Sequence, residues 1–369
     1  MIASRLEQVH GAMDRLQIDG FLVLTEENRR YLSGFTGEDH HFDESAGALL
    51  ITAERLVLAT DTRFELQAKH EAPDYELVIY RDGFAKSLAE LVQRFTIRRL
   101  GFECVRVSVQ QFDQWRKTLK EEGATPEWVP LEDLVEQFRQ IKSPEEIERT
   151  RRALALAEEA FLEVLKEMRP GMTEIAVAWD LERRMREAGA DALSFPPIVA
   201  AGPNSALPHA IPSDRPIGTG EPILFDWGAK LNGYCSDTSR TVILGDADDT
   251  FRKVHDTVLE AQRRAIAAIR AGASSKVVDA EARDFIHQQG FEGKFGHGLG
   301  HGTGLAVHEA PRLSPLRDTP LEAGMLVTVE PGIYLPEWGG VRIENQVVVG
   351  EDGPIVLNRL ATHWEALSG

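Results

Sequence analysis

Carboxylates at the ends of apolar strands restrict the fold of this 369-residue chain more than any other feature. Asp226 lies near the end of the apolar run ILFDWG, where a charged group is stable only if it is paired or coordinated. Asp237 follows in the run GYCSDTSRTVI, beyond a hairpin turn formed by Asn232 and Gly233. The hairpin therefore brings the two carboxylates together, and the strand period of two puts Ser239 on the same face as Asp237.

The same arrangement recurs near the C-terminus. Glu330 ends the run MLVTVE, directly before a turn at Pro331 and Gly332, and Glu344 lies in VRIENQVVV on the same face as Arg342. Four such carboxylates would repel one another strongly without cations beside them. An arginine network is able to hold one or two of them, whereas metal ions would account for the whole set.

A glycine-rich segment, FGHGLGHGTGLAVHE, supplies the histidines His297, His301 and His308. The first two have the spacing of zinc ligands on a helix, but the alternating glycines disfavour a helix and the HExxH glutamate is missing. The glycines instead allow the backbone to approach a crowded centre. Four carboxylates and one imidazole suit two divalent ions, with Mn²⁺ or Co²⁺ favoured over Zn²⁺ or Fe²⁺. Two ions roughly 3.5–4 Å apart can share one water, lower its pKa and promote hydrolysis.

The length of the chain favours two domains. We predict an α/β N-terminal domain at 1–125, a linker at 126–142 and a catalytic domain at 143–369, which opens with a helix-capping box, Ser-Pro-Glu-Glu. In the second domain the order helix, helix, strand, strand occurs twice, which indicates an internal duplication. The predicted helices are 3–18, 84–95, 131–139, 143–168, 173–189, 249–271 and 276–289. The predicted strands include 21–24, two strands within 48–60 that are joined by a tight turn at Ala53 and Glu54, 99–103, 222–228 and 233–243.

Composition excludes several classes of partner. Asp and Glu number 59 against 41 Lys and Arg, a formal net charge of -18, so the surface should repel nucleic acid and anionic lipid. With only two cysteines, Cys104 and Cys235, the chain has no disulfide scaffold. Its first residues resemble an amphipathic helix rather than a signal peptide, and no apolar run approaches the roughly 20 residues of a membrane span. We therefore expect a cytoplasmic protein with neither a nucleic-acid nor a membrane partner.

Taken in order, these segments resemble the creatinase/aminopeptidase P/prolidase family, the "pita-bread" metallopeptidases. The resemblance rests on D-x-G, SDTSRT, GHGLGHGTG, VHE, TVEPGIY and VRIEN, and on the early segment NRRYLSGFTG, so it spans essentially the whole chain. It implies an α/β fold with a creatinase-like N-terminal domain before a pita-bread domain. It also implies the metal ligands Asp226, Asp237, His301, Glu330 and Glu344, with Asp237 and Glu344 bridging both ions.

The resemblance further implies roles for residues around the ligands. His308 matches a histidine that stabilises the tetrahedral intermediate, and Glu330 the general base that accepts a proton from the bridging water. His209, in the loop LPHAIP, matches a substrate-side histidine, and His297 a pocket-lining position, although both could instead be packed in the core. Arg342 matches an arginine beside the ligands, although it could serve only to neutralise the carboxylates.

The implied activity is that of a metallo-exopeptidase that hydrolyses the Xaa-Pro bond, as an aminopeptidase or a dipeptidase, through a metal-bridging hydroxide. Its substrate would be a peptide with proline at the second position. A related C–N hydrolase of the same fold is one alternative. A catalytically inactive protein- or RNA-binding module is another, but such modules lose ligands that this chain keeps.

The chain departs from the family pattern after GFTG, where residues 38–46 form a polar insertion with His40, His41, Asp43 and Glu44. This insertion is either a solvated loop or a flap that narrows the active site of a partner subunit. Because the N-terminal domain of family members commonly reaches over a neighbouring subunit, we expect a homodimer.

Overall fold

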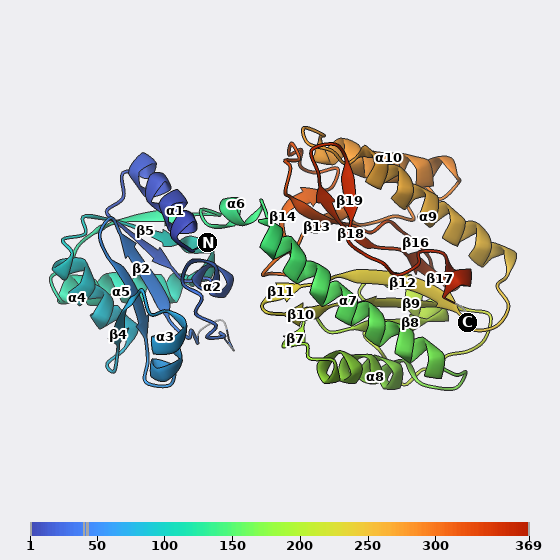
Figure 1. The fold of residues 1–369 in the computed structure, drawn as a ribbon, viewed down its shortest axis with the longest axis horizontal. Coiled ribbons are helices and arrows are strands. Elements are labelled where there is room, and N and C mark those ends of the chain that lie inside the picture. Colours follow the sequence, from blue (N-terminus) through green and yellow to red (C-terminus); the bar gives the residue numbers. More distant parts are fainter. Residues whose placement is uncertain (1, 40, 42–43, 368–369) are drawn as a thin grey trace. The chain divides into compact units, whose positions relative to one another are not determined.

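The protein, described here by a computed structural model over residues 2–39, 41 and 44–367, consists of two compact units. The units are Met1–Phe138 and Arg139–Gly369. Each combines helices with a β-sheet framework (Figure 1). The predicted α/β class is therefore confirmed.

The N-terminal unit is built on a six-stranded mixed sheet with the order β4-β3-β2-β1-β5-β6. Strand β1 pairs antiparallel with β2 and parallel with β5. Leucines of the central strands, such as Leu22 and Leu50, pack with Leu88 of α4 and Leu119 of α5, so these two helices cover one face of the sheet. The elements are α1 (Ile2–Leu16), β1 (Gly20–Val23), α2 (Glu26–Ser33), β2 (Ala48–Thr52), β3 (Leu56–Thr60), α3 (Glu65–Glu71), β4 (Glu76–Ile79), α4 (Phe84–Arg94), β5 (Arg99–Glu103), α5 (Val109–Glu121), β6 (Glu127–Leu131) and α6 (Glu136–Arg139).

Strand β6 lies within residues 126–142, where the sequence indicates a linker. It pairs parallel with β5 and forms one edge of the sheet. Pro130 reads as a strand breaker in the sequence, but an edge strand tolerates a residue without an N–H because one side of the strand has no neighbour. The edge position therefore explains why a proline-bearing segment belongs to this sheet.

The C-terminal unit holds its strands between two helix pairs, α7 with α8 and α9 with α10 (Figure 1). Each pair packs on its own cluster of apolar strand residues, which confirms the predicted duplication. The helices are α7 (Pro144–Glu167), α8 (Glu174–Glu187), α9 (Asp249–Ala268) and α10 (Ser275–Gln288). The strands are β7 (Ala192–Leu193), β8 (Ile198–Ala201), β9 (Pro222–Trp227), β10 (Ala229–Leu231), β11 (Tyr234–Cys235), β12 (Thr238–Ile243), β13 (Gly300–Gly302), β14 (Glu309–Leu313), β15 (Leu326–Val329), β16 (Gly332–Leu335), β17 (Gly339–Arg342), β18 (Asn345–Val349) and β19 (Pro354–Val356).

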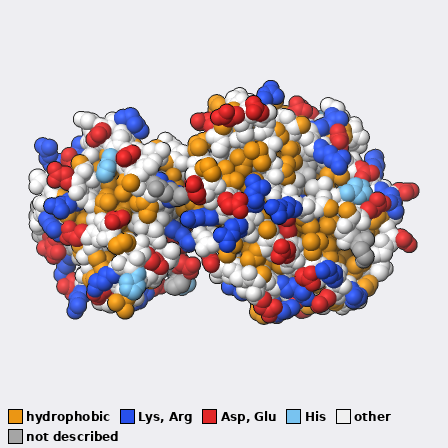
Figure 2. Space-filling model, viewed as in Figure 1, with side chains coloured by type: hydrophobic (Ala, Val, Ile, Leu, Met, Phe, Trp, Pro, Cys, Tyr) orange, Lys and Arg blue, Asp and Glu red, His pale blue; other side chains and the backbone are white. Residues whose placement is uncertain are grey.

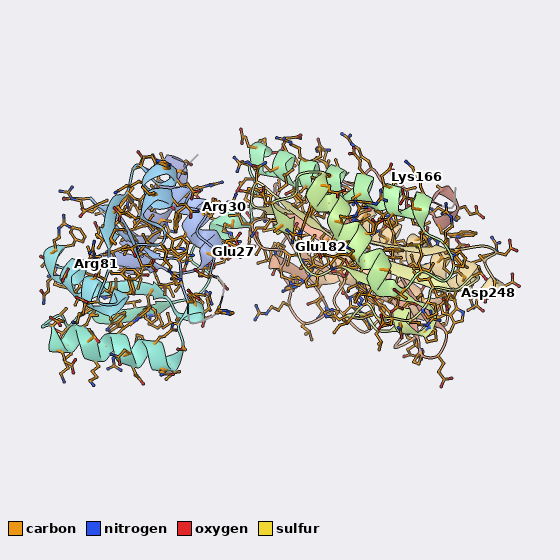
Figure 3. All side chains as sticks on the ribbon, turned by 90° about the horizontal axis from the view of Figure 1, so that it is seen from below. Glu27, Arg30, Arg81, Lys166, Glu182 and Asp248 are labelled. Carbon is orange, nitrogen blue, oxygen red and sulfur yellow. The ribbon has the colours of Figure 1, made fainter. Side chains whose placement is uncertain are left out.

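Side-chain caps fix where the long helices begin. Helix α7 starts with the predicted capping box, in which Ser143 Oγ accepts from the backbone N–H of Glu146 at 3.3 Å and Glu146 Oε2 accepts from that of Ser143 at 2.8 Å. Helix α9 has Asp248 as its N-cap, and Oδ1 of this residue accepts from the backbone N–H of Phe251 at 2.6 Å. Figure 3 labels Asp248 at the molecular surface.

The surface seen in Figure 2 mixes acidic, basic and apolar side chains on each unit. No helix in the described part of the chain is long and apolar enough to cross a membrane. Neither Cys104 nor Cys235 forms a disulfide with a described residue.

Candidate metal centre

Alternation along β9 directs Asp226 toward the centre. Its neighbours Phe225 and Trp227 are fully buried in the core beneath α7, where Trp227 stacks on Phe161 with ring centroids 4.2 Å apart. The indole N–H of Trp227 donates to the backbone oxygen of Ala157 at 2.9 Å. Because successive strand residues point to opposite faces, these anchors leave Asp226 on the face opposite α7.

The hairpin between β10 and β11 brings Asp237 back beside Asp226. Its turn has positive φ angles at Asn232 (49°) and Gly233 (82°), as the Asn-Gly pair predicts. A Cβ at Gly228 would lie 2.0 Å from the backbone oxygen of Ser236, so only glycine allows the chain to fold back this closely. Strand β12 then pairs antiparallel with β9.

The glycines around His301 likewise allow neighbouring backbone segments to approach closely. A Cβ at Gly300 would lie 2.0 Å from the backbone oxygen of Thr328, and one at Gly302 would lie 2.1 Å from that of Ala310. The imidazole Nδ1 of His301 lies 3.0 Å from the backbone oxygen of Gly302. A proton on Nδ1 satisfies that contact and leaves the lone pair of Nε2 free to bind a cation.

Three of the predicted ligands converge most tightly. One ligand atom from each of Asp237, His301 and Glu344 lies within 4.8 Å of the other two. Glu330 joins them, because its Oε1 lies 3.3 Å from Nε2 of His301. The carboxylate of Glu344 accepts a hydrogen bond from Ser239 Oγ at 2.8 Å, through one oxygen only.

Arginine neutralises only part of this negative charge. Arg342 donates from Nη2 to Asp226 Oδ2 at 2.7 Å and forms its ion pair there. Within the described part of the chain, Asp237, Glu330 and Glu344 have no ion pair with lysine or arginine. The arginine-network alternative therefore accounts for one carboxylate of the four.

The electrostatics of the protein alone disfavour the ionised form of three of the four carboxylates. Burial, followed by repulsion from Glu344, raises the pKa of Asp237 well above its usual value. Burial and the charge of Glu330 raise the pKa of Glu344 in the same way, and burial also raises the pKa of Asp226. Burial acts to raise the pKa of Glu330 too, but the hydrogen bond and charge of His301 outweigh it and lower this pKa to about 2.

Two buried oxygens at the centre lack protein partners. Oδ1 of Asp226 and Oε1 of Glu344 are inaccessible to solvent and accept no hydrogen bond from any described residue. A buried carboxylate oxygen without a donor is costly unless a cation binds it. Four carboxylates, one imidazole and one arginine carry an excess of negative charge that divalent ions would offset, so the donor set fits a pair of such ions.

The predicted histidines surround the same cavity of about 750 Å³. His308 lies nearest the ligands, with its ring centroid 4.4 Å from that of His301. Burial, and then the neighbouring His301, lower the pKa of His308 to about 4. The cavity brings together all nine predicted site residues: His209, Asp226, Asp237, His297, His301, His308, Glu330, Arg342 and Glu344.

Two residues of the site, Tyr334 and Arg312, were not predicted from the sequence. Tyr334 on β16 links two predicted residues, because its hydroxyl accepts from Arg342 Nη1 at 2.8 Å and lies 2.9 Å from Nε2 of His297. Burial raises the pKa of Tyr334 to about 12. Arg312 on β14 lines the cavity and makes no ion pair with any described residue. The alternation of GIYL after Glu330 and the position of Arg312 beyond His308 were the available sequence signals.

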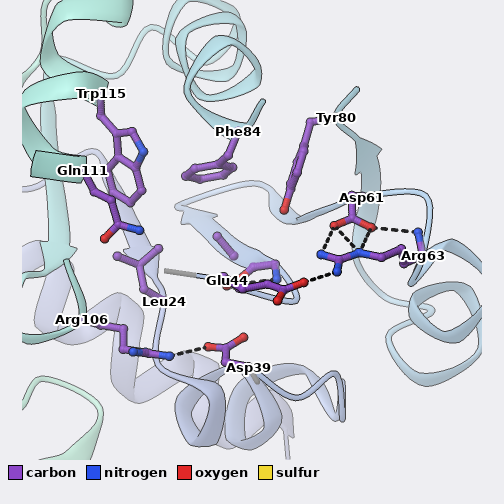
Figure 4. Close-up of a pocket in the computed structure, with 13 residues that line it drawn as sticks. Leu24, Asp39, Glu44, Asp61, Arg63, Tyr80, Phe84, Arg106, Gln111 and Trp115 are labelled. Carbon is purple, nitrogen blue, oxygen red and sulfur yellow. Dashed lines mark hydrogen bonds and ion pairs between the residues drawn. The ribbon is translucent and has the colours of Figure 1, made fainter. Parts of the chain in front are cut away.

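The insertion is anchored within the N-terminal unit at its first part. The buried carboxylate of Asp39 pairs with Arg29 at 2.7 Å and with Arg106 at 3.2 Å, and Glu44 pairs with Arg63. Asp39, Glu44, Arg63 and Arg106 border a cavity of about 340 Å³ whose opposite side carries aromatic rings (Figure 4). His40 and Asp43 lie outside the described residues. The aromatic residues are Tyr80, Phe84 and Trp115.

Comparisons with known proteins agree with this geometry. Residues 148–351 match metallopeptidase family M24, and residues 5–141 match the creatinase/prolidase N-terminal domain. An uncharacterized peptidase of Bacillus subtilis is 41% identical over 97% of this chain and 98% of its own length. A solved Xaa-Pro dipeptidase from Bacillus anthracis is 39% identical with a TM-score of 0.92, covering 98% of this chain and 99% of that one. A solved X-Pro aminopeptidase from Thermotoga maritima is 38% identical with a TM-score of 0.86, covering 95% and 99%.

The matched segments include all five predicted ligands, and the expected family is confirmed over nearly the whole chain. The chain is a metallo-hydrolase that belongs to metallopeptidase family M24.

Proposed function

We propose that this protein is an Xaa-Pro dipeptidase with two divalent ions, Mn²⁺ or Co²⁺, held by Asp226, Asp237, His301, Glu330 and Glu344. The observation that carries the proposal is the pair of buried carboxylate oxygens, Asp226 Oδ1 and Glu344 Oε1, that have no donor among the described residues. Their position on a cavity shared with all predicted histidines supports a catalytic rather than a structural pair of ions. The names of the Bacillus anthracis and Thermotoga maritima relatives support the Xaa-Pro specificity.

The ions, when bound, would supply a shared hydroxide at neutral pH and positive charge beside the scissile carbonyl. Asp237 and Glu344 would bridge the two ions. Glu330 would accept the proton of the attacking water. His308, kept neutral by its burial beside His301, would donate a hydrogen bond to the developing oxyanion.

Residues around the ligands would orient them and the peptide. Arg342 holds one oxygen of Asp226 and donates to the hydroxyl of Tyr334, which fixes the direction of its guanidinium. His297 is held by Tyr334 and would line the pocket. His209, from the loop between η2 (Gly202–Ala206) and β9, would face the substrate.

Arg312 supports a dipeptidase over an aminopeptidase. It lines the cavity and forms no ion pair with the described residues, so its guanidinium is available to an anion. A dipeptide presents its terminal carboxylate directly after proline, whereas a longer peptide presents it farther away. Arginine binds carboxylates through two parallel N–H donors, which favours the shorter substrate.

Hydrolysis of Xaa-Pro and Xaa-Pro-Yaa peptides by the Mn²⁺- and Co²⁺-loaded protein tests this proposal. We expect faster turnover of the dipeptide, and a selective rise in its KM when Arg312 is changed to methionine. Arg317 also lines the cavity, so Arg317→Met serves as the matched control. Preference for the tripeptide would indicate an aminopeptidase, and no hydrolysis of either would favour a binding module.

We also propose that the protein works in the cytoplasm as a homodimer. The family resemblance supports the dimer. Cys104 and Cys235 form no disulfide with a described residue, which is compatible with a reducing compartment. Light scattering of the purified protein would measure the mass of the assembly.

A further inference from the structure

A buried histidine lies on α9, among residues that the proposed catalysis does not use. His255 has no exposed surface, and neither of its ring nitrogens has a hydrogen-bond partner among the described residues. Buried polar atoms in proteins are nearly always partnered, so an imidazole with two free nitrogens needs an explanation. Burial lowers the pKa of His255 to about 3, which leaves the ring neutral with an unprotonated lone pair. Neutral imidazole is the form that binds metal ions.

Two further donors face this ring. One ligand atom from each of His255, Asp256 and His363 lies within 4.8 Å of the other two. Nε2 of His363 lies 3.7 Å from Oδ1 of Asp256, close to the separation of two ligand atoms around one tetrahedral ion. His363 comes from the C-terminal segment, directly before η3 (Trp364–Ala366), so the group joins α9 to the end of the chain.

The two imidazoles are arranged as a pair that could share an ion. Their ring centroids lie 5.4 Å apart with an interplanar angle of 69°. Two imidazoles on one tetrahedral ion, with metal–nitrogen distances of about 2.0–2.1 Å, have centroids roughly 5 Å apart. The other aromatic neighbour, Phe251, stacks on His255 at 5.7 Å and offers no hydrogen-bonding group.

A second carboxylate lies near the other ring nitrogen of His363, Nδ1. Oε2 of Glu365 lies 3.9 Å from Nδ1 of His363, and the backbone N of Glu365 lies 3.4 Å from the same atom. If Nδ1 of His363 carried a proton, it would no longer accept from the backbone N–H of Glu365. It would donate to the carboxylate of Glu365 instead. Such an acidic partner commonly fixes the orientation of a metal-bound imidazole.

We propose that His255, Asp256 and His363 form a third cation site, separate from the catalytic pair, for a divalent transition ion such as Zn²⁺. Two imidazoles and one carboxylate suit Zn²⁺ or Co²⁺, whereas Mg²⁺ and Ca²⁺ prefer oxygen ligands alone. The site has three protein ligands and would be completed by water, because Asp256 and His363 reach the surface.

The ion would brace the segment that precedes His363. The backbone oxygens of Leu360 and Ala361 accept hydrogen bonds from the buried Arg240 at 3.0 and 2.8 Å. Arg240 also donates to the backbone oxygen of Glu344, one of the catalytic ligands. A cation at His363 would therefore hold the C-terminal segment in the position where it orients Arg240, so the third site stabilises the structure around Glu344.

Metal counting on the full-length protein tests the site independently of activity. Chelated protein is dialysed against a low concentration of Zn²⁺, and bound zinc per chain is measured. We expect one ion fewer in His363→Ala and in Asp256→Asn than in the wild type. Both side chains are partly exposed, so neither change should prevent folding, as circular dichroism would verify. His287→Ala is the matched control, since His287 is an exposed histidine beside a single carboxylate, Glu292.

Hydrogen exchange supplies the second measurement. Zn²⁺ should slow exchange of the amides in residues 357–367 in the wild type and in His287→Ala, but not in His363→Ala. Equal zinc content in the wild type and both site variants would overturn the proposal. If the site variants lose one zinc ion but Zn²⁺ does not slow amide exchange in the wild type, the cation site is supported. Its bracing of the C-terminal segment is then refuted.

Discussion

Asp237 is a residue at which metal binding and protein stability have opposite requirements. Its pKa is raised well above the usual value by burial and then by Glu344, so its charge is unfavourable in the protein alone. Asp237→Asn keeps the size of the side chain but removes one charge and one proposed ligand. We expect the metal-free variant to unfold at higher temperature than the metal-free wild type, because repulsion is relieved.

With metal present the order should reverse. The variant should bind less metal, gain less stability from it and lose several kcal/mol of transition-state stabilisation. Thermal unfolding with and without Mn²⁺, together with metal analysis and turnover, measures all three. Asp246→Asn is the control, since Asp246 is an exposed acid shortly after β12, the strand that directly follows Asp237. Equal metal content in Asp237→Asn and wild type would remove Asp237 from the ligand set.

His308 should act on the transition state rather than on substrate binding. Its ring is beside that of His301 and faces the cavity, where a donor to the oxyanion would be needed. His308→Ala should lower kcat by about 100- to 1,000-fold, or roughly 2.7–4 kcal/mol, with little change in KM or metal content. Steady-state kinetics of metal-loaded protein would check this, with His287→Ala as control. An effect on KM alone would make His308 a substrate-positioning residue.

Site residues could be predicted wherever a charge interrupts an apolar strand. Asp226 and Glu330 stand out because such a position is unfavourable without a cation or a partner. Tyr334 gives no such signal, since a tyrosine in a strand usually only packs. Its role depends on bonds to Arg342 and His297, residues of a neighbouring strand and of the glycine-rich segment, and these follow only from the tertiary structure.

Among the elements, a capping signal led to a correct prediction where an apolar period followed it. The capping box at Ser143 gives the start of α7 correctly. Helix α5 has an equivalent box, with Ser108 Oγ accepting from the N–H of Gln111, yet the sequence analysis did not predict this helix. This helix has so many polar residues that its apolar period is weak. The Ser-x-x-Gln spacing could still have indicated its start. The short helix α2 has few apolar residues, and its buried Asn28 and Arg29 depend on distant carboxylates.

The loop between β13 and β14, which carries His308, depends on a buried ion triad. Glu309 pairs with Lys142 at 3.0 Å and with Arg139, and it also accepts from the N–H of Ala306 at 3.0 Å. Burial acts to raise the pKa of Glu309, but Lys142 and then Arg139 outweigh it and lower this pKa to about 2. The triad therefore ties Arg139 and Lys142 to the loop of His308.

Glu309→Gln should destabilise the protein by about 3–5 kcal/mol, because it leaves two buried cations without a counter-charge. Turnover should also fall while metal content stays unchanged, since the loop, but no ligand, is displaced. Urea unfolding and kinetics at low denaturant would measure both effects, with the exposed Glu292→Gln as control.

A second change makes this prediction sharper. Lys142→Met in the Glu309→Gln background removes one uncompensated cation and should recover part of the stability. If turnover stays low while stability recovers, Glu309 positions His308 directly. Unchanged stability in Glu309→Gln would contradict a structural role for the triad.

At the scale of the whole molecule, a pair of metal ions does not explain why an enzyme would remove only terminal residues. All five proposed ligands belong to the C-terminal unit, so the N-terminal unit is free for another task. The anchoring of Asp39 by the buried Arg29 gives the insertion a fixed base in its own unit. We therefore propose that the insertion limits substrate length at the site of a partner subunit.

Because the ion pair between Asp39 and Arg29 anchors the insertion, Asp39 should stay unchanged in the test. We expect the triple variant His40→Ser, His41→Ser and Asp43→Ser to accept longer peptides than the wild type, with the same metal content and the same dimer mass. Under this proposal the insertion limits the length of the bound peptide, so smaller side chains in it should relax that limit. Turnover over a series from Xaa-Pro to longer peptides measures the change, and His70→Ser, an exposed histidine of the same unit, is the control. Identical length profiles for all three proteins would show that the insertion is a solvated loop and that another segment sets the length limit.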